Sequence, residues 1–156
     1  ITEAQHVLTA GVVVRSRRQS ATPAALLRQE GRVDDQYVTL AWDDSRHVGV
    51  IVLNDPAHFN GLGSALTGDL GKIVKHVSAM VHARGFVLQA AGPHFCVGGN
   101  PYSQHVDTSV AALADILLTT ARSCCKLREL LSPVTAAVHG HLAGGGIALC
   151  LKVILS

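Results

Sequence analysis

Residues 134–146 read VTAAVHGHLAGGG, a short apolar run that ends in a glycine-rich turn. Residues 85–99, GFVLQAAGPHFCVGG, show the same arrangement earlier in the chain. Because glycine has no Cβ, its backbone N–H can approach a ligand atom closely. Two such N–H groups aimed at one oxygen form an oxyanion hole, which stabilises negative charge developing on that oxygen. The pair of turns therefore predicts strand–turn units that present backbone donors to a carbonyl oxygen.

The spacing of apolar residues places these turns in a repeating order of strands and helices. Alternating or continuous apolar runs indicate strands, and apolar residues at three- and four-residue steps indicate amphipathic helices. The strands are expected at 37–42, 48–53, 86–90 and 134–138, and the helices at 64–83, 108–131 and after Gly146. The pattern places Val81 on the apolar face of the first helix and Leu117 on the inward face of the second. This order favours a layered α/β fold.

Three motifs resemble the crotonase (enoyl-CoA hydratase/isomerase) superfamily. They are Leu53-Asn54-Asp55-Pro56 followed by Asn60, FCVGGN at 95–100, and GHLAGGG at 140–146. The resemblance implies an α/β crotonase-like ββα spiral, truncated after the second oxyanion-hole turn. It divides the chain into an N-terminal arm or linker at 1–36 and a partial crotonase-like domain at 37–156.

The resemblance also implies a site. In the family, a thioester carbonyl lies between two backbone N–H groups, and by position these groups belong here to Gly99 and Gly145. The first N–H groups of the helix that follows the second turn lack intrahelical partners, and the helix dipole adds partial positive charge there. The resemblance further implies four residues along the channel that binds the thioester carrier: Asn60, Leu62, Gly98 and Gly144.

The residues that move protons are less well defined. Hydratases of this family resemble one another in using two glutamates; Ala148 stands at the first position, and the second position lies beyond Ser156. An oxyanion hole still needs a general acid or base. Tyr102 and His105, in the loop after the first turn, are the candidates for this acid or base.

Two classes of function remain open. The first is an acyl-thioester-binding domain of the dehydratase, hydratase or isomerase type, in which coenzyme A or the phosphopantetheine of an acyl carrier protein carries the substrate and no cofactor is bound permanently. The motifs at 92–96 and 138–141 are most similar to polyketide-associated members. The alternative is a catalytically inactive truncated crotonase that serves as a structural subunit of a larger assembly, because the apolar run at 147–155 needs cover.

The composition favours some classes of partner and cellular compartment over others. Hydrophobic residues make up 48% of the chain and charged residues 15%, which indicates extensive burial, either internally or against partners. We expect a homo-oligomer or a subunit of a larger complex. The formal net charge of +2 is too small to indicate a nucleic-acid partner. No apolar run approaches the roughly 20 residues of a membrane-spanning helix. The four cysteines lack a metal-binding spacing, which favours free thiols in a reducing compartment, either the cytoplasm or an organelle.

Overall fold

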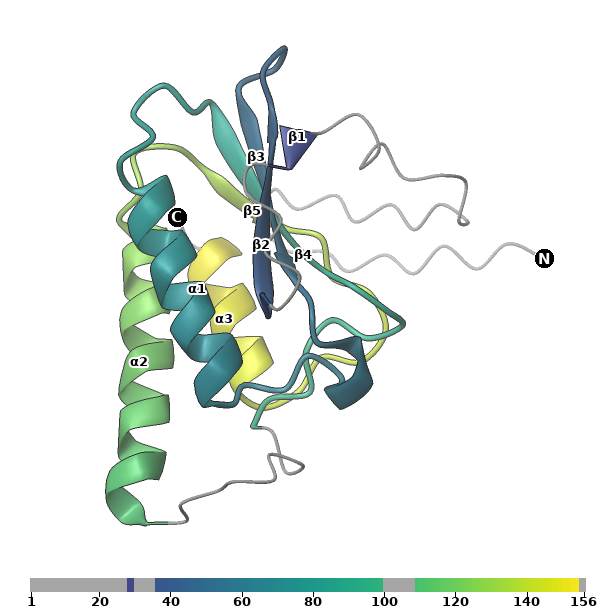
Figure 1. Ribbon diagram of the computed structural model, residues 1–156, viewed down its shortest axis with the longest axis vertical. Helices are drawn as coiled ribbons and strands as arrows, with labels where there is room; N and C mark the ends of the chain where they lie inside the picture. Colours follow the sequence, from purple (N-terminus) through teal and green to yellow (C-terminus); the bar gives the residue numbers. More distant parts are fainter. Residues whose placement is uncertain (1–27, 30–35, 100–108, 155–156) are drawn as a thin grey trace, which may run out of the picture.

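A computed structural model describes residues 28–29, 36–99 and 109–154. Its elements are, in chain order, β1 (Arg28–Gln29), β2 (Val38–Asp43), β3 (Val48–Leu53), η2 (Pro56–His58), α1 (Ser64–Val77), β4 (Gly85–Ala90), α2 (Val110–Arg128), β5 (Val134–Ala136) and α3 (Gly145–Ile154). Within these residues the strands form one five-stranded sheet in chain order. All three α-helices lie on one face of that sheet, with α2 outermost (Figure 1).

The sheet begins with two antiparallel pairings and continues with two parallel ones. β1 and β2, like β2 and β3, are antiparallel, and a tight turn after Asp43 joins the latter two. β4 pairs in parallel with β3, and β5 pairs in parallel with β4. Because parallel strands end at the same edge of a sheet, the segments that follow β3, β4 and β5 gather there, and both glycine-rich turns belong to them.

A second β segment follows each of the three parallel strands before the next helix begins. Leu62, after β3, forms a parallel bridge with Gly99, after β4. Cys96, also after β4, forms a parallel bridge with Leu142, after β5. The chain therefore repeats a strand, a segment with isolated β-bridges and a helix, an arrangement that matches the expected ββα unit.

The core lies between the sheet and the helices. β3 alternates buried and partly exposed residues, as a strand with one covered face does. α1 buries residues at three- and four-residue steps, namely Leu66, Leu70, Val74 and Val77. Ser109 caps α2 by accepting a hydrogen bond from the Ala112 N–H at 3.2 Å. These contacts fix the helix layer on the sheet and leave the turns at its edge.

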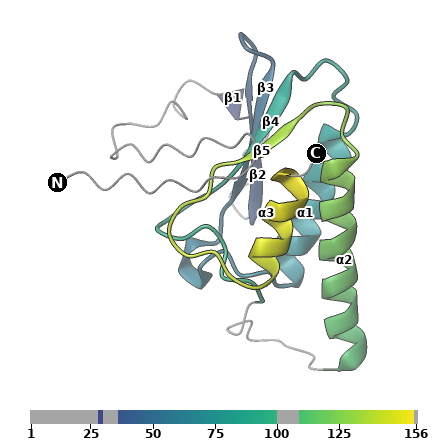
Figure 2. The ribbon, with the colours of Figure 1, turned by 180° about the vertical axis from the view of Figure 1, so that it is seen from behind.

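Two details differ from the sequence prediction. α1 ends at Val77, so Val81, which was placed on its apolar face, is 66% exposed. Leu117 of α2 was expected to face inward but is 70% exposed. The reason is visible in Figure 2, where the N-terminal half of α2 extends past the ends of α1 and α3. In addition, β1 lies within the predicted N-terminal arm and pairs with β2, so two residues of that arm extend the sheet.

Candidate functional site

Three segments run side by side at the carboxyl edge of the parallel strands. The Val97 N–H donates to the Phe59 carbonyl at 3.3 Å, and the Leu62 N–H donates to the Gly98 carbonyl at 2.6 Å. On the other side, the Ala143 N–H donates to the Cys96 carbonyl at 3.0 Å. These bonds hold the segment 95–99 between 59–62 and 141–146. The two glycine-rich turns are thereby aligned along their length.

Backbone contact between the turns requires glycine at position 98. Gly98 has φ +89°, a conformation that residues with a Cβ rarely adopt. A methyl group added there would lie 2.9 Å from the Ala143 carbonyl oxygen and 3.1 Å from the Gly145 nitrogen. Gly144, with φ +51°, faces the Gly98 Cα from the other turn. The first turn therefore lies directly against the start of α3.

The Gly99 N–H points away from the neighbouring segment. The Gly98 carbonyl accepts from Leu62, and the trans peptide bond directs the following N–H to the opposite side. Within the described residues no hydrogen bond from the Gly99 N–H is found. A methyl group added at Gly99 meets no atom of the described residues within 4 Å. The Gly99 N–H therefore has no hydrogen-bond partner within the part of the chain that the structure describes.

The Gly145 N–H is the first of α3. The N–H groups of Gly146 and Ile147 bond back to the carbonyls of Ala143 and Gly144, at 3.0 and 3.1 Å. No hydrogen bond from the Gly145 N–H is present among the described residues. An unpaired N–H at a helix start is a preferred position for negative charge. Both predicted donors thus lie beside the contact between the two turns.

The structure gives the four predicted carrier-binding residues different surroundings. The Asn60 side chain is fully buried and joins two segments: its Oδ1 accepts from the Asp55 N–H at 2.8 Å, and its Nδ2 donates to the carbonyls of Ala91 and His94 at 2.9 and 2.8 Å. Leu62 is buried directly against Gly145. Gly98 and Gly144 form the contact between the turns. Asn60 therefore has a clear role in holding the fold, and carrier binding by these four residues stays a prediction.

Comparison with known proteins identifies the architecture. A model of the family described as enoyl-CoA hydratase/isomerase matches residues 43–153. The chain belongs to the enoyl-CoA hydratase/isomerase family. A probable enoyl-CoA hydratase of Mycobacterium leprae is 32% identical over 111 residues, which cover 67% of this chain and 37% of that protein. An (E)-benzylidenesuccinyl-CoA hydratase of Thauera aromatica is 30% identical over 108 residues, 69% of this chain and 41% of that protein.

Solved structures agree with this family. The enoyl-CoA hydratase of Mycobacterium smegmatis superposes with a TM-score of 0.68 at 26% identity, covering 74% of this chain and 46% of that one. The Bacillus anthracis enoyl-CoA hydratase gives 0.69 at 25% identity, with 76% and 45% covered. The chain therefore has the crotonase fold over about three quarters of its length. It spans less than half the length of these relatives.

Of the positions considered for proton transfer, only Ala148 lies within the described residues. Ala148, at the position where family hydratases resemble one another in carrying a glutamate, is an exposed residue in the first turns of α3. Tyr102 and His105 lie outside the described residues. Within the described part of the chain, no group of three or more His, Cys, Asp or Glu side chains is arranged to hold a metal ion. None of the described helices is long and apolar enough to cross a membrane.

Three of the four cysteines pack in the core, and all four carry free thiols. Cys96, Cys124 and Cys150 are buried, and Cys125 is exposed. Burial raises the pKa of Cys96. Burial, together with the neighbouring Cys96 and Cys124, raises the pKa of Cys150 to about 12. The thiolate is the nucleophilic form of cysteine, so burial and a raised pKa both disfavour nucleophilic attack by Cys96 and Cys150.

Sequence reasoning did not single out His94. Its Nδ1 lies 2.9 Å from the Nδ1 of His141, on the other glycine-rich segment. Both residues stand just before the bridge between Cys96 and Leu142. The sequence shows that the two histidines occupy matching positions in the two turns. It does not show that they are in contact, because that depends on the parallel register of the two segments.

Proposed function

We propose that this chain binds an acyl thioester and stabilises the enolate form of its carbonyl group between the N–H groups of Gly99 and Gly145. The observation that supports this proposal is the direct backbone contact of the two turns, at which both N–H groups lack a partner within the described residues. The reaction would be of the hydratase, dehydratase or isomerase type, in keeping with the family.

The chemistry follows from where charge develops. When water adds to the β-carbon of an enoyl thioester, or when a proton leaves the α-carbon, an electron pair moves onto the carbonyl oxygen. Two fixed N–H donors stabilise that oxygen without having to reorganise. The start of α3 adds partial positive charge at Gly145. Removal of one such donor typically lowers kcat by about 10²–10³, or roughly 2.7–4 kcal/mol.

Coenzyme A is the favoured carrier. The relatives named above are hydratases, and the name of the Thauera aromatica protein specifies a CoA thioester. We retain Tyr102 and His105 as the proposed acid and base, since Ala148 cannot exchange a proton. A carrier protein and a polyketide pathway remain predictions from the sequence motifs. The inactive structural subunit is not favoured, because the matched family and its named members are enzymes.

Exposed apolar side chains indicate that the helix layer has a further partner. On α3, Ile147 is 43% exposed and Leu151 is 52% exposed. On α2, Leu117 and Leu118 are 70% and 52% exposed. Apolar residues grouped on helices in this way mark protein–protein contact. We propose that a homo-oligomer or larger complex of this family covers them.

Two substitutions at one position test the donor role of Gly145. Gly145→Pro removes the N–H, and proline is well tolerated at the first position of a helix. Gly145→Ala adds a Cβ at the same place but keeps the N–H. The assay follows exchange of the α-protons of butyryl-CoA in D₂O by NMR, because that exchange requires enolate formation and no further chemistry.

We expect the proline variant to lose about 10²–10³ in exchange rate relative to the alanine variant, with thermal unfolding used to confirm that both are folded. Equal rates in the two folded variants would exclude the Gly145 N–H as a donor. If neither these variants nor the unmodified chain catalyses exchange or binds butyryl-CoA, the proposal of a thioester-binding site is wrong.

A further inference from the structure

Two histidine side chains meet where the two glycine-rich segments begin to run side by side. The Nδ1 atoms of His94 and His141 are 2.9 Å apart. Gly140, with φ +58°, permits this approach, because a Cβ at that position would lie only 3.0 Å from the His94 Nδ1. The parallel bridge between Cys96 and Leu142 joins the two segments just beyond the pair. The backbone therefore holds the two rings together.

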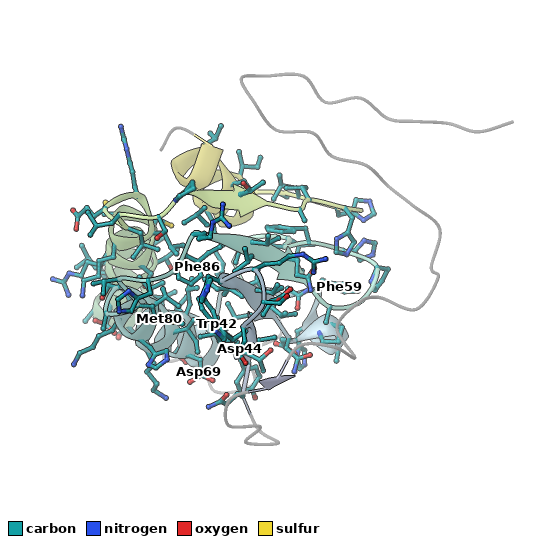
Figure 3. The ribbon with its side chains drawn as sticks, turned by 90° about the horizontal axis from the view of Figure 1, so that it is seen from above. Trp42, Asp44, Phe59, Asp69, Met80 and Phe86 are labelled. Atoms are coloured by element: carbon teal, nitrogen blue, oxygen red, sulfur yellow. The ribbon has the colours of Figure 1, made fainter. Side chains whose placement is uncertain are left out.

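The pair is accessible to dissolved ions. His141 is exposed, and His94 is half-buried. The Phe59 ring packs against the His94 ring with centroids 5.5 Å apart, and Figure 3 shows Phe59 at the end of the molecule remote from α1 and α2. The His94 ring is thus supported on one side by a packing contact, while its partner in the pair faces the solvent.

The geometry of the pair fits two imidazoles bound to one metal ion. With metal–nitrogen bonds of about 2.0–2.1 Å, two nitrogen atoms 2.9 Å apart subtend an angle of about 90° at the metal. Two imidazole rings bound at that angle have centroids about 4.5 Å apart, and here the centroids are 4.3 Å apart. A straight N–H···N bond of the same length would separate the centroids by about 5.2 Å. The rings are therefore inclined as they would be around a shared ion.

This angle distinguishes between metals. Neighbouring ligands of a square-planar or octahedral ion are separated by about 90°, whereas tetrahedral zinc would need the two nitrogen atoms about 3.3–3.4 Å apart. Tetragonal sites with imidazole ligands are typical of Cu²⁺ and Ni²⁺. Among the described residues, no third His, Cys, Asp or Glu joins the pair to form a larger metal-binding group. Water would therefore supply the remaining ligands.

The neighbouring histidines have other partners. The Nε2 of His139 donates to a backbone carbonyl at 2.9 Å. The Nδ1 of His58 donates to the Asp55 carboxylate at 2.8 Å. Among the described histidines, only His94 and His141 have ring nitrogens in contact with each other. The pair is therefore the one place in the described part of the chain where two imidazole ligands are already brought together.

We propose that His94 and His141 form a metal site that binds one Ni²⁺ or Cu²⁺ ion through their Nδ1 atoms. The proton that one Nδ1 carries in the hydrogen bond moves to the Nε2 of the same ring, so that each Nδ1 donates a lone pair to the metal. The ion then links the two glycine-rich segments and stabilises the folded chain. This site does not depend on the proposed function, because neither Gly99 nor Gly145 supplies a ligand.

Isothermal titration calorimetry with NiCl₂ at pH 8 measures the site without any substrate. We expect the unmodified chain to bind one Ni²⁺ ion. His94→Asn and His141→Asn each remove one ligand nitrogen and should weaken binding by about tenfold or more, since even a residue that only orients a metal ligand contributes about 10–100-fold. Two matched controls should bind like the unmodified chain: His82→Asn, at an exposed histidine outside the pair, and Cys125→Ser, which removes the exposed thiol.

The electron paramagnetic resonance spectrum of Cu²⁺ bound to the unmodified chain gives a second measurement. We expect coupling to two imidazole nitrogens, and a spectrum with one coupled nitrogen or none would overturn the proposal even if neither asparagine variant folded. Absence of Ni²⁺ binding would also overturn it. So would an affinity in either His94→Asn or His141→Asn equal to that in His82→Asn, because both rings must be ligands.

Discussion

The two glycine-rich turns look alike in sequence, yet their donor glycines have different surroundings. In the first turn, Gly98 makes the close contact, and Gly99, the predicted donor, has open space where a side chain would be. In the second turn the predicted donor is itself crowded: a Cβ at Gly145 would lie 2.7 Å from the Leu62 Cδ1. Glycine is therefore needed at position 98 for packing and backbone conformation, whereas at 99 no packing reason requires it.

The largest effect on stability is expected within the first turn. Gly98→Ala forces a Cβ against the Ala143 carbonyl oxygen in a left-handed conformation, and we expect it to cost about 2–4 kcal/mol of unfolding free energy. Gly99→Ala adds the same atom in open space and should change that free energy by less than about 0.5 kcal/mol. Urea unfolding of both variants measures the difference. Similar losses in the two would show that the contact at Gly98 is not the reason for its glycine.

A smaller effect is expected in the second turn. Gly145→Ala crowds Leu62, and overpacking of this kind costs about 1–3 kcal/mol. Leu62→Val removes the Cδ1 atom that the new Cβ would meet. In the Leu62→Val background we therefore expect Gly145→Ala to cost less than about 0.5 kcal/mol. A double-mutant cycle by urea unfolding gives this coupling directly, and an additive result would contradict it.

The smallest effect on stability is expected outside both turns, in the hairpin that joins β2 and β3. Hydrogen bonds from the Ser45 side chain first, and then from Arg46, lower the pKa of Asp43 to about 2. Because this folded-state pKa lies below the unfolded value, the contribution of Asp43 to stability is present above about pH 4 and is lost as the pH falls toward 2.

Asp43→Asn should therefore lower the urea midpoint slightly at pH 7 and leave the two midpoints equal near pH 2. A difference between the two chains that grows as the pH falls would contradict this sign. Asp43→Asn should not alter the loss of unfolding free energy caused by the substitutions at Gly98 and Gly145. The hairpin therefore provides a reference for those variants.

Much of this fold could be predicted because its signals are local. The strands around Asp43, the strand–helix order and both glycine-rich turns follow from periodicity and from the chemistry of glycine. The end of α1 and the exposure of Leu117 could not be predicted, because apolar periodicity does not show how far a helix extends past its neighbours. A periodic pattern places a residue on a face, and only the packed structure decides whether anything covers that face.

The site shows the same division. A family resemblance predicts Gly99 and Gly145 as its donors, and the structure brings the two turns that carry them into contact. The hydrogen bonds that the Asn60 side chain donates to the Ala91 and His94 carbonyls, and the contact between His94 and His141, join residues that lie more than thirty positions apart. Such contacts depend on the register of β3, β4 and β5, which a single sequence does not contain.

The most direct test of the central claim is the ¹³C NMR shift of a crotonyl-CoA labelled at the thioester carbonyl, measured free and bound to the chain. We predict a downfield shift on binding, because two N–H donors would polarise the carbonyl. That shift should persist in Gly145→Ala and largely disappear in Gly145→Pro. A bound carbonyl with the shift of the free thioester, or an equal shift in both variants, would contradict an oxyanion hole formed with Gly145.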